Sequence, residues 1–209
     1  MDKKELYQYV GSMQQMAYIR KVTCEEGRST GLRMFDVKNE CLQYQVMCDK
    51  CLDVAGFSYK GINMNFLSKP GLQGRNHYDT NGQEALRSIM GGLFFTAGME
   101  NICAPYKNET GEYPMHGRIR TTPAGGVSSS QEWTKDGLVL KVSGTMREAE
   151  LFGENMVLRR SIESVAGSKS IKVIDEIENE ASLSHQSGIS IPDTCNEVLH
   201  PNKKSNSKG

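Results

Sequence analysis

The sequence predicts an all-β protein built as an antiparallel β-sandwich. Three segments, 138–145, 156–163 and 170–178, alternate apolar and polar residues with the period of two that places every second side chain on one face of a strand. Short turns such as Lys135-Asp136-Gly137 precede them, and no helix-length pattern lies between them. Successive strands without intervening helices favour an antiparallel meander in a sandwich over a parallel α/β sheet.

The earlier part of the chain predicts a short helix and then more sheet. Residues 5–20 space their apolar side chains at roughly helical intervals, which indicates a short helix followed by a strand. From Lys21 onward, short alternating runs such as 43–47 predict strands. Residues 83–87 predict a helical turn, and 91–98 predict a buried strand whose flanking glycines let the backbone approach another segment closely.

The strand pattern stops near Glu180, so we expect one sandwich domain over residues 1–180. Residues 181–209 are polar and carry little strand pattern, which predicts a divergent, poorly ordered tail. A three-strand meander that stops there leaves an unpaired edge, which folded proteins normally close or cover. We therefore expect a sandwich that is incomplete at its C-terminal side, as a frameshifted or prematurely ended gene would produce.

The balanced charge argues against nucleic acid or an anionic membrane as the partner. The 209 residues include 25 Lys+Arg and 25 Asp+Glu, so no global field attracts nucleic acid or an anionic membrane, and a small polar ligand is expected instead. The sequence shows no export signal and no apolar run of membrane-spanning length, which predicts a cytoplasmic protein whose six cysteines are reduced.

The densest polar chemistry lies in residues 113–124, which contain His116, Arg118 and Arg120 between two prolines. In an extended chain His116 and Arg118 would lie on the same side and could face a sugar-sized ligand. A structural histidine, capped by a backbone carbonyl, fits the same residues, and spacing alone favours that second interpretation.

Cys48 and Cys51 have the spacing of half a zinc or redox site. No second pair follows and no histidine lies at ligand spacing, so we expect no metal there. In the same segment, Lys50 and Asp53 are either ligand contacts at the end of a strand or solvated turn charges.

Other polar residues also allow two interpretations. Asn101, after the predicted strand 91–98, is either at the rim of a pocket or a hydrogen-bonding residue of a loop. Glu148, Glu150 and Glu154 are expected to be solvated charges around a hairpin, and only a pocket location would make them acid/base candidates.

The order of segments along the chain carries a family resemblance up to about residue 180. It resembles the uncharacterised bacterial branch of the aldose 1-epimerase (galactose mutarotase-like) superfamily. The segments that carry the resemblance are 6–11, 31–39, 49–54, 59–63, 91–93, Met115-His116-Gly117-Arg118 and Phe152-Gly153-Glu154-Asn155.

The resemblance implies a large antiparallel β-supersandwich and an isomerase that interconverts the anomers of free sugars. In that chemistry a carboxylate takes the proton of the anomeric hydroxyl while an imidazolium protonates the ring oxygen. The ring opens to an aldehyde, rotates and recloses on its other face. Proton transfers suffice, so no cofactor is expected.

The resemblance also implies roles for particular residues. His116 looks like the first catalytic histidine of the family, which positions and polarises the sugar, and Arg118 is its expected neighbour. Lys50, Asp53 and Asn101 complete the predicted substrate-binding set.

The chain departs from the family pattern at several positions. Lys50 stands where relatives usually have Arg, which keeps the charge but loses the planar two-pronged donor, and Cys51 stands where they usually have Gly. The second histidine and the catalytic glutamate of the family are not recognisable, and His185 and His200 match no family motif.

The sequence therefore predicts a carbohydrate-binding, aldose 1-epimerase-like protein with a monosaccharide as its partner. The missing acid/base residues leave open whether this chain catalyses anomer exchange by itself. The alternatives are a non-catalytic sugar-binding β-sandwich and a non-functional fragment. The sequence names neither the sugar nor the oligomeric state.

Overall fold

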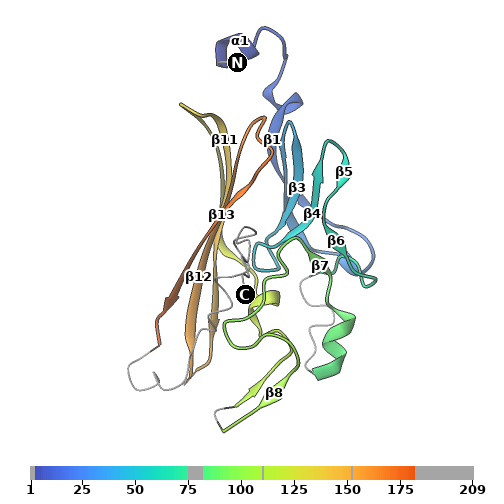
Figure 1. Ribbon diagram of the computed structural model, residues 1–209, viewed down its shortest axis with the longest axis vertical. Helices are drawn as coiled ribbons and strands as arrows, with labels where there is room; N and C mark the ends of the chain where they lie inside the picture. Colours follow the sequence, from blue (N-terminus) through green and yellow to red (C-terminus); the bar gives the residue numbers. More distant parts are fainter. Residues whose placement is uncertain (1–2, 75–81, 110, 152, 182–209) are drawn as a thin grey trace, which may run out of the picture.

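Two large antiparallel sheets form most of the part of the chain that the structure describes. The computed structural model describes residues 3–74, 82–109, 111–151 and 153–181. One sheet has the strand order β1-β2-β3-β4-β5, the other has the order β10-β11-β12-β13, and Figure 1 shows them beside each other. The predicted all-β antiparallel architecture is confirmed.

The first sheet is built from the N-terminal third of the chain. Tight turns join β2 to β3 and β4 to β5, while a longer turn, Cys48–Asp53, separates β3 from β4. Its strands are β1 (Ala17–Thr23), β2 (Arg33–Asn39), β3 (Leu42–Met47), β4 (Val54–Tyr59) and β5 (Ile62–Asn63).

In the described residues, helical structure is confined to short pieces. Helix α1 (Lys3–Leu6) and the 3₁₀ turn η1 (Met13–Gln15) precede β1, so the prediction of a short helix followed by a strand is confirmed. A second 3₁₀ turn, η2 (Gly27–Ser29), lies between β1 and β2. Within the described ranges, no helix is both long enough and apolar enough to cross a membrane.

The part of the chain that follows the first sheet and precedes the second lies toward one end of the molecule (Figure 1), and its described residues form small elements. They are β6 (Phe66–Leu67), η3 (Gly82–Arg87), β7 (Gly91–Gly92), β8 (Tyr106–Lys107), β9 (Glu112–Tyr113) and η4 (Ile119–Thr121). The predicted helical turn at 83–87 is confirmed by η3.

The predicted strand at 91–98 is wrong beyond its first two residues. Phe95 has a φ of +47°, in the left-handed region, so the backbone leaves the extended conformation after β7. The predicted close approach of the glycines is confirmed, because a Cβ on Gly91 would lie 2.9 Å from the carbonyl oxygen of Phe66.

The second sheet contains the three predicted strands and one more. β11 (Gly137–Ala149), β12 (Asn155–Val165) and β13 (Lys172–Asn179) match the predicted meander. The unpredicted strand, β10 (Gly125–Thr134), pairs with β11 at the edge of the sheet. Most of its side chains are exposed, so it lacks the apolar alternation by which the other strands were found.

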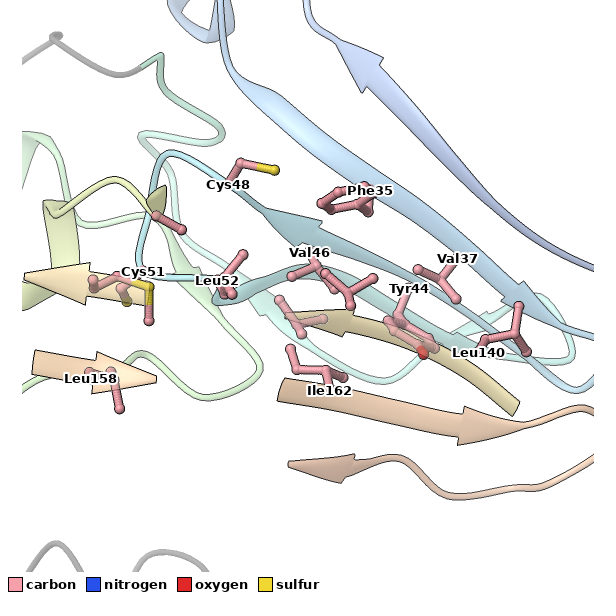
Figure 2. Packing of buried hydrophobic residues seen from close by; sticks show 14 of the residues in the cluster. Phe35, Val37, Tyr44, Val46, Cys48, Cys51, Leu52, Leu140, Leu158 and Ile162 are labelled. Carbon is pink, nitrogen blue, oxygen red and sulfur yellow. The ribbon is translucent and has the colours of Figure 1, made fainter. Parts of the chain in front are cut away.

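The core lies between the inner faces of the two sheets. Figure 2 shows Phe35, Val37 and Val46 of the first sheet opposite Leu140 and Ile162 of the second. Polar bonds join the same faces at one end: the hydroxyls of Tyr44 and Ser164 lie 2.9 Å apart, and the buried Asn39 amide donates to the carbonyls of Val165 and Ser168. The inner faces of the two sheets therefore share one hydrophobic core.

Part of the domain prediction falls beyond the described chain. The described residues end at Ala181, directly after the predicted 1–180 domain. The tail predicted for 181–209 otherwise lies outside the described residues.

Leu140→Ala should lower the free energy of unfolding by about 2–5 kcal/mol, because Leu140 is fully buried and its loss leaves a cavity in the core. Leu151→Ala is the matched control, since Leu151 is 85% exposed and its loss should change stability by less than about 0.5 kcal/mol. Urea unfolding followed by circular dichroism measures both. Equal effects would contradict the assignment of the core.

Candidate functional site

Polar side chains converge on a hollow at the end of the first sheet. The turn between β3 and β4, the segment around β7 and the 3₁₀ turn η4 all contribute to its wall. The enclosed cavity measures about 20 Å³, within about 320 Å³ of empty space that includes the open mouth. The charged, aromatic and hydroxyl residues on its wall are Lys50, Asp53, Ser88, Phe95, Thr96, Arg120 and Thr121, of which Lys50, Asp53 and Ser88 are buried.

The turn that carries Lys50 and Asp53 is buried and tied to a distant segment. Cys51 and Leu52 both have positive φ, 41° and 55°, which folds the chain back tightly between the two strands. The N–H of Cys51 donates to the carbonyl of Thr122, and the carbonyl of Cys48 accepts from the N–H of Ala124. These bonds hold the turn against the segment that follows η4.

Asp53 is held by backbone amides. Its carboxylate accepts from the N–H groups of Val54 at 2.7 Å, Phe94 at 3.3 Å and Thr96 at 2.6 Å. Burial raises the pKa of Asp53 above its ordinary value, although these donors and the charge of Arg160 oppose the rise. The carboxylate therefore organises the loop from Phe94 to Thr96 as well as facing the hollow.

Arg160 lies behind the hollow on the inner face of β12. Its guanidinium donates to both carboxylate oxygens of Asp175 on β13, at 2.8 and 2.6 Å, and to the hydroxyl of Thr96 at 2.7 Å. It also donates to the carbonyl of Cys51 at 3.3 Å. Burial, the largest single effect, lowers the pKa of Arg160, but the hydrogen bonds to Asp175 and the charges of Asp175 and Asp53 contribute to a net rise above its ordinary value, so the guanidinium stays charged.

His116 lies beside the hollow, with its ring edge-on to Phe95 at a centroid distance of 5.0 Å. Its Nδ1 accepts a hydrogen bond from the N–H of Cys103 at 3.2 Å, which places the proton of the neutral ring on Nε2. Burial lowers the pKa of His116 below its ordinary value, and the charge of Arg120 lowers it further. His116 is therefore a neutral donor near pH 7.

Arg118 does not lie with His116 on one side of an extended chain, so that prediction is wrong. The chain turns at His116 and Gly117, whose φ values are +60° and +69°, and enters η4. The guanidinium and the backbone N–H of Arg118 both donate to the carboxylate of Glu100.

Asn101 acts within the loop rather than on the hollow. Its side-chain amide donates to the carbonyls of Ala104 and Pro114, both at 2.9 Å, and only 8% of the residue is exposed. Of the two interpretations of Asn101, the structure supports the loop hydrogen-bonder.

Comparison with known proteins identifies the family. The sequence matches DUF4432, described as a domain of unknown function, over residues 29–189. The chain belongs to the DUF4432 family. No curated protein matches its sequence.

The structure of this DUF4432 chain is similar to two solved structures. One, from Klebsiella pneumoniae, is described as a "putative aldose 1-epimerase" and gives a TM-score of 0.68 at 17% identity over 78% of this chain and 43% of that one. The other, a galactose 1-epimerase from Lactobacillus acidophilus, gives 0.47 at 15% identity over 78% of this chain and 49% of that one. The first likeness confirms the predicted aldose 1-epimerase-like fold, and this chain spans less than half of either structure.

The structure brings together Lys50 and Asp53 of the five predicted site residues, with His116 beside them. Arg118 and Asn101 are not on the wall of the hollow. Their roles in the DUF4432 chain, like those of the other three, stay predictions.

Sequence reasoning missed Arg120 and Arg160. Arg120 stands in the polar stretch 113–124, but only the 3₁₀ turn η4 directs it toward the hollow. Arg160 carried a usable signal, because it stands between Leu158 and Ile162 at a core-facing position of an alternating strand. A charge at such a position needs a buried partner, and the paired strand supplies Asp175.

The cysteine pair has the chemistry of buried structural thiols. Burial raises the pKa of Cys48, and it raises the pKa of Cys51 to about 12, so both stay protonated. Among the described residues, no group of three or more His, Cys, Asp or Glu side chains is placed to hold a metal ion, and the five described cysteines are free. Cys195 lies outside the described residues.

Gly117→Ala should destabilise the DUF4432 chain more than Gly61→Ala does. Both glycines have positive φ, which costs about 1–2 kcal/mol for alanine. At Gly117 a Cβ would also lie 2.7 Å from the carbonyl oxygen of Gly98, which adds about 1–3 kcal/mol of overpacking, whereas Gly61 has open space. Urea unfolding measures the difference, and equal losses would contradict the tight packing of the His116 turn.

His116 should titrate below its ordinary pKa of 6.5, because the folded protein disfavours its protonated form. Arg120→Gln should raise this pKa by removing a nearby positive charge, whereas Lys172→Gln, an exposed change on β13, should leave it unchanged. A pH titration of the imidazole signals by NMR measures all three. A midpoint at or above 6.5 in the unaltered chain would contradict the neutral assignment.

Proposed function

We propose that this DUF4432 chain binds a monosaccharide at the mouth of the hollow and supplies the substrate-holding part of an aldose 1-epimerase-like site. The observation that carries the proposal is the convergence of charged and hydroxyl groups from three separate segments on one hollow, with an aromatic ring on its wall. A sugar offers hydroxyls to such groups and C–H faces to such a ring. The fold it shares with the Klebsiella pneumoniae protein agrees with this assignment.

The size of the hollow limits how the sugar binds. An enclosed volume of about 20 Å³ holds roughly one water molecule. The sugar therefore lies across the mouth, where the side chains of Lys50, Arg120 and Thr121 donate hydrogen bonds to its oxygens.

The proposed reaction opens and recloses the sugar ring. A base removes the proton of the anomeric hydroxyl, an acid protonates the ring oxygen, and the carbonyl that forms is attacked from its other face when the ring recloses. His116 contributes as a donor through Nε2, polarising a sugar oxygen, because its ring is neutral near pH 7.

A second candidate is a sugar-binding domain without catalysis. The contacts of Asp53 favour it: this carboxylate lines the hollow, but both of its oxygens already accept backbone hydrogen bonds that hold the loop from Phe94 to Thr96. Sugar binding is common to both candidates, and only anomer exchange separates them.

Titration calorimetry with neutral hexoses, pentoses and sugar acids tests the shared part. Lys50→Met should weaken binding of the preferred sugar by about 10- to 100-fold, since a hydrogen bond from a charged group is lost, and His116→Gln by about 2- to 12-fold. Lys172→Met, an exposed lysine on β13, is the matched control and should bind as the unaltered chain does.

Exchange spectroscopy by NMR on the bound sugar then separates the candidates. Anomer exchange faster than in buffer supports the epimerase, and exchange at the buffer rate with intact binding supports the binding domain. Absence of binding across the panel, in a chain shown by circular dichroism to be folded, would contradict both.

A further inference from the structure

A buried glutamate, Glu148, lies on the inner face of β11, near the C-terminal end of that strand. Glu148 was expected to be a solvated hairpin charge, but only 5% of it is exposed. It follows Met146 in the alternation of β11 and pairs with Met156 of β12, both of which are core residues. A carboxyl group at this depth needs a compensating interaction.

The neighbour of Glu148 is a second carboxyl group, that of Glu100. The Glu100 side chain is itself 6% exposed and accepts hydrogen bonds from Arg118, through the guanidinium and through the backbone N–H at 3.0 Å. The ionised member of the pair is therefore Glu100, because it has the cation.

Among the residues that the structure describes, no donor bonds either carboxyl oxygen of Glu148. Two buried carboxylates in contact repel each other, whereas one carboxylic acid and one carboxylate form a strong O–H···O⁻ bond. A hydrogen bond between Glu148 and Glu100 therefore requires a proton on one of them, and Glu148 is the member to which Arg118 does not donate.

We infer that Glu148 is a positioning residue: it carries a proton, donates it in a hydrogen bond to Glu100, and so holds the His116–Arg118 turn against the second sheet. The chain of contacts runs from β11 through the Glu100 carboxylate to the N–H of Arg118, which directly follows Gly117. The His116–Arg118 turn packs closely on Gly98 and Asn101, because a Cβ added to Gly117 would lie 2.7 Å from the carbonyl oxygen of Gly98 and 3.3 Å from that of Asn101.

The electrostatics of the surrounding groups agree with this assignment. Burial raises the pKa of Glu148, the hydrogen bond and charge of Glu100 raise it further, and Glu154 adds to the rise, while Arg118 opposes it. The result is a pKa of about 9, so the proton stays in place at pH 7.

The assignment predicts that the contact between Glu148 and Glu100 is lost at alkaline pH. When Glu148 ionises near pH 9, two buried carboxylates face each other and the contact with the turn is lost. Since the folded state holds a proton that the unfolded state releases near pH 4.5, the stability of the fold falls as the pH rises from about 5 to about 9. Glutamine at position 148 is neutral and can donate to Glu100, so it should abolish this dependence while keeping the turn.

Carbon-13 NMR of the full chain with labelled glutamate carboxyls tests the proton directly. One signal, absent in Glu148→Gln, should titrate near pH 9, and the His116 imidazole signals should shift with the same midpoint in the unaltered chain but not in the glutamine variant. Glu148→Leu cannot donate and should displace the His116 signals already at pH 7. Glu132→Gln, an exposed glutamate on β10, is the matched control.

Each outcome decides the assignment without a sugar or an activity. A Glu148 signal that titrates near 4.5, or His116 signals indifferent to the ionisation of Glu148, would overturn it. If Glu148→Leu does not fold, the titration of the unaltered chain still gives the answer.

Discussion

The guanidinium of Arg160 lies inside the molecule, where a charge left without partners would cost several kcal/mol. Asp175 neutralises it across the β12–β13 pair, and its remaining donors reach Thr96 and the carbonyl of Cys51. Thr96 also donates its backbone N–H to Asp53. One buried cation thus joins the second sheet to the β3–β4 turn and to the loop at Thr96, which both line the hollow. The position of the hollow therefore depends on the packing of the two sheets.

The fold could be predicted where burial leaves a periodic signal. Strands β11 to β13 have one face in the core and one in solvent, and their alternation was sufficient to find them. Strand β10 was not predicted because both of its faces are largely solvated. Leu93 and Phe94 suggested a longer strand than β7, since a short apolar run does not reveal that Phe95 adopts a left-handed conformation.

The site could be predicted only in part, because its geometry comes from turns. Lys50 and Asp53 were predicted as contacts and do line one hollow, whereas Arg118 was placed by assuming an extended chain that the structure replaces with a turn. The burial of Glu148 could not be foreseen from a hairpin rich in glutamates, since it depends on where Glu100 lies in space. Residues on strands were therefore easier to place than residues whose backbone conformation is set by distant contacts.

The hydroxyl contact between Tyr44 and Ser164 joins residues 120 positions apart, and the contacts of Asn39 span a similar length. Such non-local pairing slows folding, because a long loop must close before any contact forms. At roughly 5–20 residues per second, synthesis takes roughly 6–24 s to advance from Tyr44 to Ser164. Until the second sheet is made, Phe35, Val37 and Val46 lack the residues of β11 and β12 that cover them in the fold. The nascent chain is thus most exposed to aggregation, and most dependent on chaperones, between the synthesis of the two sheets.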